Sequence, residues 1–148
     1  MTEKEAEFWI RRFEGGNEDD RYRASDELRI VMRLMLHSNI RIATICDLTV
    51  YSYRQRYYVT MRGGEYMYNF DVYDEDDEIV EAYIRKKKLK DNDYIIQVSK
   101  EALRKKFRHL VSVYYEGEEE ERPELKDLYG AGIGREYKPM KRPKKTEE

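Results

Sequence analysis

The sequence has little of the chemistry that crosslinks or anchors a chain. Its 148 residues include one cysteine, three prolines and two histidines. Cys46 alone cannot form an internal disulfide, which favours a reducing compartment. No apolar run approaches the ~18 residues of a membrane span. The opening MTEKEAEFW lacks the basic and then apolar layout of a signal peptide. We therefore expect an intracellular, cytoplasmic protein with no membrane partner.

Neither sign of charge is in excess. Lys and Arg number 29 against 31 Asp and Glu, so the net charge predicts no polyanionic partner. The composition is still not that of a disordered chain, because 14 Tyr, 4 Phe and 1 Trp supply apolar surface. From Glu116 onward an acidic run (EGEEEERPE) precedes a basic one (REYKPMKRPKK). We expect a single domain over residues 1–115 and a disordered, acidic-then-basic tail over residues 116–148.

Capping signals and apolar periodicity predict an α+β fold. Two N-terminal helices precede an antiparallel three-stranded meander, and a helix, a strand and a last helix follow. A helical interpretation of residues 43–48 remains open within the first strand. The expected helices cover residues 2–15, about 20 or 25 to 37, 74–90 and 100–115, and the expected strands cover residues 40–50, 53–61, 66–72 and 94–99.

The stretch RQRYYVTMRGGEYMYNFDVY, residues 54–73, predicts a β-hairpin with a two-residue Gly-Gly turn. Two of its three arginines then face carboxylates across the strands, which stabilises the register. The hairpin is therefore interpreted first as scaffold, and Arg54 and Tyr58 remain as candidate contacts to a ligand. The expected cross-strand pairs are Arg62–Glu65, Thr60–Met67, Tyr58–Asn69 and Arg56–Asp71.

The helix after Ser99 is the strongest candidate for a functional surface. Its apolar positions 103, 107, 110 and 114 face the core, so four cations project together on the outside: Lys100, Arg104, Lys105 and Arg108. The segment RKKKLK, which contains Lys86 and Lys87, is expected to extend the same patch. Clustered cations on a helix are typical of elements that contact phosphates. The alternative is a solvated basic face, balanced by the glutamates at 118–121.

The sequence supports a catalytic or metal site less strongly than it supports the basic surface. His37 and His109 fall on different helices, which argues against zinc, and Cys46 lies in an apolar stretch that favours an inert thiol. A weaker alternative is a metal-dependent nuclease, whose ligands would come from Asp47, Glu65, Asp71 and Asp74. Two of these carboxylates already have arginine partners in the expected hairpin. We expect no enzyme activity, no catalytic residue, no metal and no cofactor.

The sequence thus favours a small non-enzymatic protein that contacts nucleic acid through its basic helix. This hypothesis requires the cations of both basic segments to converge without nearby acids cancelling them. One alternative is a protein–protein interaction module, an inhibitor or adaptor, that uses its tyrosines and its charged tail to bind a protein partner. Another is a homodimer, suggested by the apolar content of residues 20–37.

Overall fold

The central helix of the fold is buried on nearly every side. In the computed structural model, which describes residues 1–15, 22–60, 66–132 and 141–143, α2 (Asp26–His37) has most of its side chains buried. The hydroxyl of Ser25 caps it by accepting the N–H of Leu28 at 3.2 Å. A helix buried on most sides lies inside a protein, and α2 accordingly forms the centre of the core, with its charged Arg33 and His37 buried as well.

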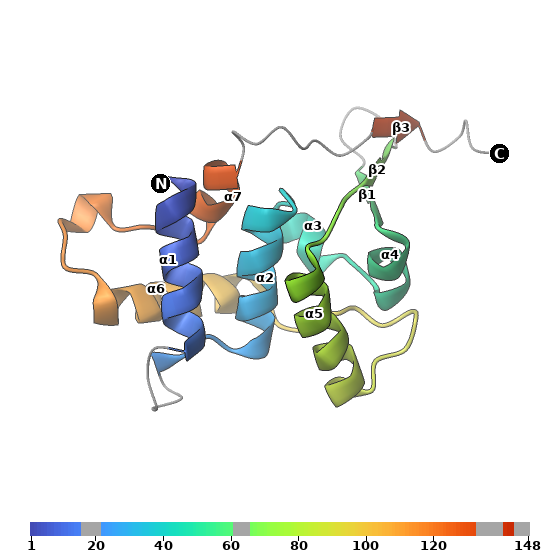
Figure 1. Ribbon diagram of the computed structural model, residues 1–148, viewed down its shortest axis with the longest axis horizontal. Helices are drawn as coiled ribbons and strands as arrows, with labels where there is room; N and C mark the ends of the chain where they lie inside the picture. The colour runs from blue at the N-terminus through green and yellow to red at the C-terminus, as the bar shows by residue number, and fades with distance from the viewer. Residues whose placement is uncertain (16–21, 61–65, 133–140, 144–148) are drawn as a thin grey trace.

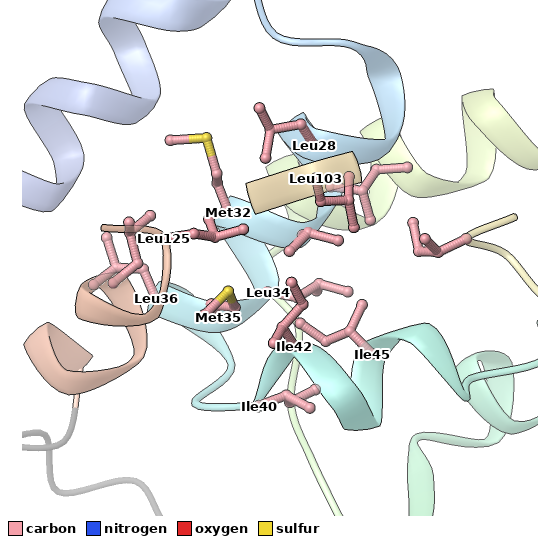
Figure 2. Close-up of a cluster of buried hydrophobic side chains, with 14 of the residues drawn as sticks. Leu28, Met32, Leu34, Met35, Leu36, Ile40, Ile42, Ile45, Leu103 and Leu125 are labelled. Atoms are coloured by element: carbon pink, nitrogen blue, oxygen red, sulfur yellow. The ribbon is translucent and has the colours of Figure 1, made fainter. Parts of the chain in front are cut away.

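Other helices surround α2 (Figure 1), and those that pack on it are α1, α3, α5, α6 and α7. Their leucine, isoleucine and methionine side chains meet in one cluster, part of which Figure 2 shows. Mixed helix and strand is therefore the fold class, as expected. The remaining α-helices are α1 (Glu3–Gly15), α3 (Ile42–Cys46), α4 (Val50–Gln55), α5 (Asp74–Lys87), α6 (Lys100–Tyr114) and α7 (Lys126–Gly132), with a 3-10 turn at Glu119–Glu121.

The sheet differs from the expected meander. It contains β1 (Tyr57–Thr60), β2 (Tyr66–Asn69) and β3 (Lys141–Pro143), all antiparallel in the order β1-β2-β3. The expected first strand, residues 40–50, is not part of it. The segment 94–99 forms no strand either, apart from an isolated bridge between Thr49 and Tyr94.

Residues 40–50 are rich in β-branched side chains yet form a helix and a turn. Ile42, Ile45 and Leu48 recur every three residues, and all three are buried. This spacing places one apolar edge of α3 against α2, and Figure 2 shows Ile42 and Ile45 beside Leu34. Burial against α2 outweighs the strand propensity, which is a weak preference of the order of 1 kcal/mol. The helical alternative for residues 43–48 is therefore the correct one.

The hairpin forms, but its register is one residue away from the expected one. Tyr58 faces Tyr68 and Thr60 faces Tyr66; the Gly-Gly turn itself lies outside the described residues. The chain stays helical until Gln55, and the carbonyl of Arg56 then accepts the N–H of Phe70 at 3.1 Å. The rings of Tyr58 and Tyr68 stack with centroids 5.3 Å apart. These contacts set the register, and Arg56 binds Asp77 instead of Asp71.

The expected disordered tail is wrong for the part that contains α7. Leu125 and Leu128 are fully buried, and α7 packs on α1 and α2. The acidic and proline-rich composition concealed these two leucines, which enter the core three residues apart. The folded unit therefore extends beyond residue 115 to include α7.

Candidate nucleic-acid interface

Two short helices follow one another at residues 42–46 and 50–55. α3 and α4 are joined by three residues, Asp47–Thr49. The Thr49 hydroxyl accepts the N–H of Ser52 at 3.1 Å, and the Ser52 hydroxyl accepts the N–H of Thr49 at 3.0 Å. This reciprocal capping box fixes where α4 begins. Leu48, within the turn, is 2% exposed and anchors the turn in the core.

Neighbouring segments hold α4 in place. Val50 and Tyr53 are fully buried, and the Tyr53 hydroxyl donates to Asp77 of α5 at 2.7 Å. Burial and this hydrogen bond raise the pKa of Tyr53, so the phenol stays protonated. The first N–H groups of α4, at Val50 and Tyr51, donate to the carbonyls of Asp93 and Asp91. Only the side chains of α4 are thus left to meet a ligand.

The outward face of α4 is polar and aromatic. Tyr51 is 49% exposed, and Gln55 is exposed at the end of the helix. Arg54 lies on the same surface, where Glu81 of α5 accepts two hydrogen bonds from it, at 2.8 and 3.1 Å. Tyr57 of β1 lies edge-on to Tyr51, with ring centroids 6.5 Å apart. Helix α4 and the hairpin therefore form one continuous surface.

Two of the sequence-predicted contact residues, Arg54 and Tyr58, lie in this region. Arg54 is at the surface but is held by Glu81. Tyr58 is half-buried, and its ring packs between Tyr68 and Phe70. The sequence analysis missed α4, although Thr49 followed three residues later by Ser52 was a usable N-cap signal.

Two of the four predicted cations of α6 line a hollow of their own. Arg104, Arg108 and Lys126 line it together with Glu124 and Leu125, and its volume is about 100 Å³. Two acids offset part of this charge, since Glu101 binds Arg104 at 3.1 Å and Glu124 lies 3.6 Å from Lys126. Lys126 is an addition that the sequence analysis did not foresee. Lys105 is exposed and Lys100 is half-buried on the same helix.

The other basic segment lies elsewhere. Lys86 binds Asp26 of α2 at 2.8 Å and lines a separate hollow of about 250 Å³ between α2 and α5. Lys87 is exposed beside it. The two basic segments thus line different hollows, and acids bind some of their cations. The convergence that the sequence hypothesis required finds no support in these contacts.

Charged side chains also meet inside the protein, in a buried ionic cluster made of Arg33, Glu14, Asp76 and His37. Arg33 is 1% exposed; it donates to both carboxylate oxygens of Glu14, at 2.6 and 2.7 Å, and to Asp76 at 2.7 Å. The imidazole Nδ1 of His37 lies 2.7 Å from Asp76. Its Nε2 contacts Glu7 of α1. The cluster joins α1, α2 and α5.

Electrostatics in this cluster favour the charged forms. Burial lowers the pKa of His37, but its bonds to Asp76 and Glu7 outweigh burial and raise the pKa overall. Burial raises the pKa of Glu14, yet hydrogen bonds from Arg33 and Arg29 bring it below its ordinary value. With both imidazole nitrogens facing carboxylates, the imidazolium form of His37 suits the site best. The cluster holds three helices together.

The remaining chemical groups are the Cys46 thiol and the side chains that could hold a metal ion. Burial and Asp47 raise the pKa of the half-buried Cys46 thiol, which disfavours the reactive thiolate. Across residues 1–15, 22–60, 66–132 and 141–143, no three His, Cys, Asp or Glu side chains are arranged to hold a metal ion. No helix in these same ranges combines the length and apolar character of a membrane span.

Comparisons with protein-family models, with curated proteins and with solved structures found no match for this chain. The site is therefore interpreted from its own geometry.

Proposed function

We propose that the protein binds nucleic acid through α4 and the β1–β2 hairpin. The observation that carries this proposal is the three-residue turn between α3 and α4, with Leu48 buried and Thr49 capping the second helix. In helix-turn-helix proteins the second helix enters the major groove of DNA. The β1–β2 hairpin follows α4 directly. An arrangement of helices does not by itself imply binding, so the side chains of this surface decide what it can contact.

The side chains suit contact with bases and sugars more than strong attraction to phosphate. Tyr51 and Gln55 lie on the outside of α4, and an exposed aromatic ring can stack on or pack against nucleic acid. Glutamine can form a two-point contact with adenine in the major groove. Arg54 would have to leave Glu81 to do the same with guanine. We therefore expect modest affinity with a shallow dependence on salt.

The cations of α6 have a supporting role in this proposal. Helix α6 packs on α3, the helix before α4. In this proposal Arg104 and Arg108, which line the same small hollow, contact a phosphate. This division of roles, phosphate contacts for position and base contacts for sequence, is general among DNA-binding proteins.

The test is a pair of matched glutamine substitutions measured by binding to short DNA and RNA duplexes. Gln55→Glu places a negative charge on α4 and should weaken binding about tenfold, because removing one base contact costs ~1–3 kcal/mol. Gln97→Glu makes the same change at an exposed glutamine outside α4 and the hairpin and should leave affinity within about twofold.

A second variant separates α4 from α6. The double change Arg104→Glu, Arg108→Glu should reduce the slope of log affinity against log salt by about one for each phosphate that the variant no longer binds. If Gln55→Glu and Gln97→Glu bind alike while the α6 variant loses binding, the interface lies on α6 and the role proposed for α4 is wrong.

A further inference from the structure

A large groove lies on the side of the molecule away from α4. It has a volume of about 710 Å³, within the range of about 300–1,000 Å³ that is usual for ligand sites. One wall comes from the first turns of α1, and the other comes from the segment between α6 and α7. Figure 1 shows α1 and the turn near residue 120 on one side of α2 and α4 on the other. The groove is thus separate from the proposed nucleic-acid surface.

The floor of the groove is apolar and partly exposed. Phe8 is 56% exposed, and its ring lies edge-on to Trp9, with centroids 5.2 Å apart. Trp9 is itself 7% exposed, and the buried Pro123 lines the opposite wall with Tyr115. A phenylalanine this exposed beside a buried tryptophan is an apolar patch that a partner side chain can cover.

The rim of the groove is acidic. Glu5, Glu121 and Asp127 line it with one basic side chain, Lys4, and with Met1, whose α-amino group is a second cation. Three negative charges therefore face two positive ones, and the lining has a net charge of −1. The hydrogen-bond donors to Glu5 and Asp127 are uncharged: Thr2 donates its hydroxyl to Glu5, and a backbone N–H donates to Asp127. Glu118 and Glu120 add negative charge beside the lining residue Tyr115, and Arg122 offsets part of it.

We propose that this groove binds a basic segment of a protein partner through one aromatic or aliphatic anchor residue flanked by Lys or Arg. The apolar floor fits the anchor, and the carboxylates on the rim fit the flanking cations. A second copy of the chain suits the groove less well, because a twofold interface would set the same acidic rims against each other. This inference is independent of the nucleic-acid proposal. Together the two surfaces would let one molecule bind nucleic acid at one end and a basic protein at the other.

The first experiment selects peptides from a random library displayed on phage, using the full-length chain as bait. The enriched sequences should share an aromatic or leucine residue with neighbouring Lys or Arg. Enrichment of acidic or uncharged sequences would overturn the proposal, as would no enrichment at all. Binding of the selected peptide should also change the fluorescence of Trp9, the only tryptophan in the chain, because it lines the groove.

Matched aromatic substitutions then locate the binding site of the selected peptide. Phe8→Glu should weaken its binding about tenfold or more, since the anchor residue would meet a carboxylate in place of an apolar floor. Tyr94→Glu changes a ring of similar exposure, 54%, outside the groove and should leave affinity within about twofold. Both side chains are exposed, so both variants should fold, which circular dichroism can verify. Equal effects of the two variants would contradict the proposed site.

The last two measurements test the role of the acidic side chains and whether the chain forms a dimer. Glu121→Gln should weaken peptide binding and lessen its dependence on salt, because one rim charge is removed. Sedimentation should show no concentration-dependent dimer. A dimer that Phe8→Glu abolishes would mean that a second copy covers the groove, and the proposal of a basic protein partner would then be wrong.

Discussion

Arg33 and Arg54 make the same kind of contact in two different regions of the molecule. Each donates two hydrogen bonds to one glutamate: Arg33 to Glu14 inside the fold, and Arg54 to Glu81 at the surface. The side chain of Arg33 is 1% exposed, whereas that of Arg54 is 43% exposed. Water can replace the partner of Arg54 but not the partners of Arg33.

This difference in exposure separates charges that stabilise the fold from charges that a ligand can bind. Breaking a buried pair leaves a charge without water or partner, so its geometry persists. An exposed pair is worth little, so a ligand can exchange with it at small cost. Arg33 therefore belongs to the architecture, and Arg54 belongs to the surface that we propose contacts nucleic acid.

The largest expected effect comes from removing the buried arginine. Arg33→Ala should lower the free energy of unfolding by about 3–5 kcal/mol, because Glu14 and Asp76 would remain buried without their partner. Chemical denaturation followed by circular dichroism measures this change. Arg29→Ala is the control: Arg29 also binds Glu14, at 2.8 Å, but is 37% exposed, and its loss should cost about 1 kcal/mol or less. Similar losses in the two variants would contradict the distinction drawn between buried and exposed arginines.

A change of pH should have an effect on the free energy of unfolding that is smaller than that of Arg33→Ala. The folded-state pKa of His37 is raised above its unfolded value, so its stabilising contribution is complete below the unfolded pKa of about 6.5. That contribution is lost as pH rises through the folded-state pKa, at about 1.4 kcal/mol for each unit that separates the two values. The groups facing the ring are Asp76, Glu7 and the ring of Tyr73.

Denaturation curves collected across this pH range measure the loss. His37→Gln keeps polar atoms at the site but cannot titrate, so its stability should show a much smaller decline between neutral and mildly alkaline pH. If the wild type and the variant decline in parallel, His37 is not the titrating group. The acidic limb provides an internal check. The lowered pKa of Glu14 predicts a separate loss of stability as pH falls through that value.

The smallest effect on stability is expected at the surface pair. Glu81→Gln should change the free energy of unfolding by less than about 1 kcal/mol, since Arg54 and Glu81 are both accessible to water. The same change frees Arg54 and removes an acid beside α4, so affinity for DNA should rise, by about two- to tenfold. A fall in affinity, or a loss of stability comparable with that of Arg33→Ala, would show that the pair is part of the architecture.

Local signals predicted the long helices well. Ser25 and Ser99 each accept a backbone N–H as N-caps do, and the Thr2 hydroxyl accepts the N–H of Glu5 at the start of α1. The acidic first turn and basic last turn of α5 suit the helix dipole. These features depend on residues three or four apart, so the order of amino acids is enough to reveal them.

Long-range contacts account for what the sequence analysis missed. α3 is a helix because its apolar edge meets α2, and α7 folds because Leu125 and Leu128 reach the same core. The hairpin register follows from where α4 ends and from the stacked pair Tyr58–Tyr68. Each of these three features depends on a contact with residues distant in the sequence, or on competition between helix and strand propensity.

The sequence by itself determined the amphipathic helices, their caps and the existence of a tyrosine-rich hairpin. Tertiary contacts determine that residues 42–46 form a helix, that Arg33 lies inside with its carboxylates, and that the cations of α5 and α6 line different hollows. The physical reason is distance. Capping and periodicity act within a turn of helix, whereas the burial of a charge or the meeting of two surfaces depends on which segments the core brings together.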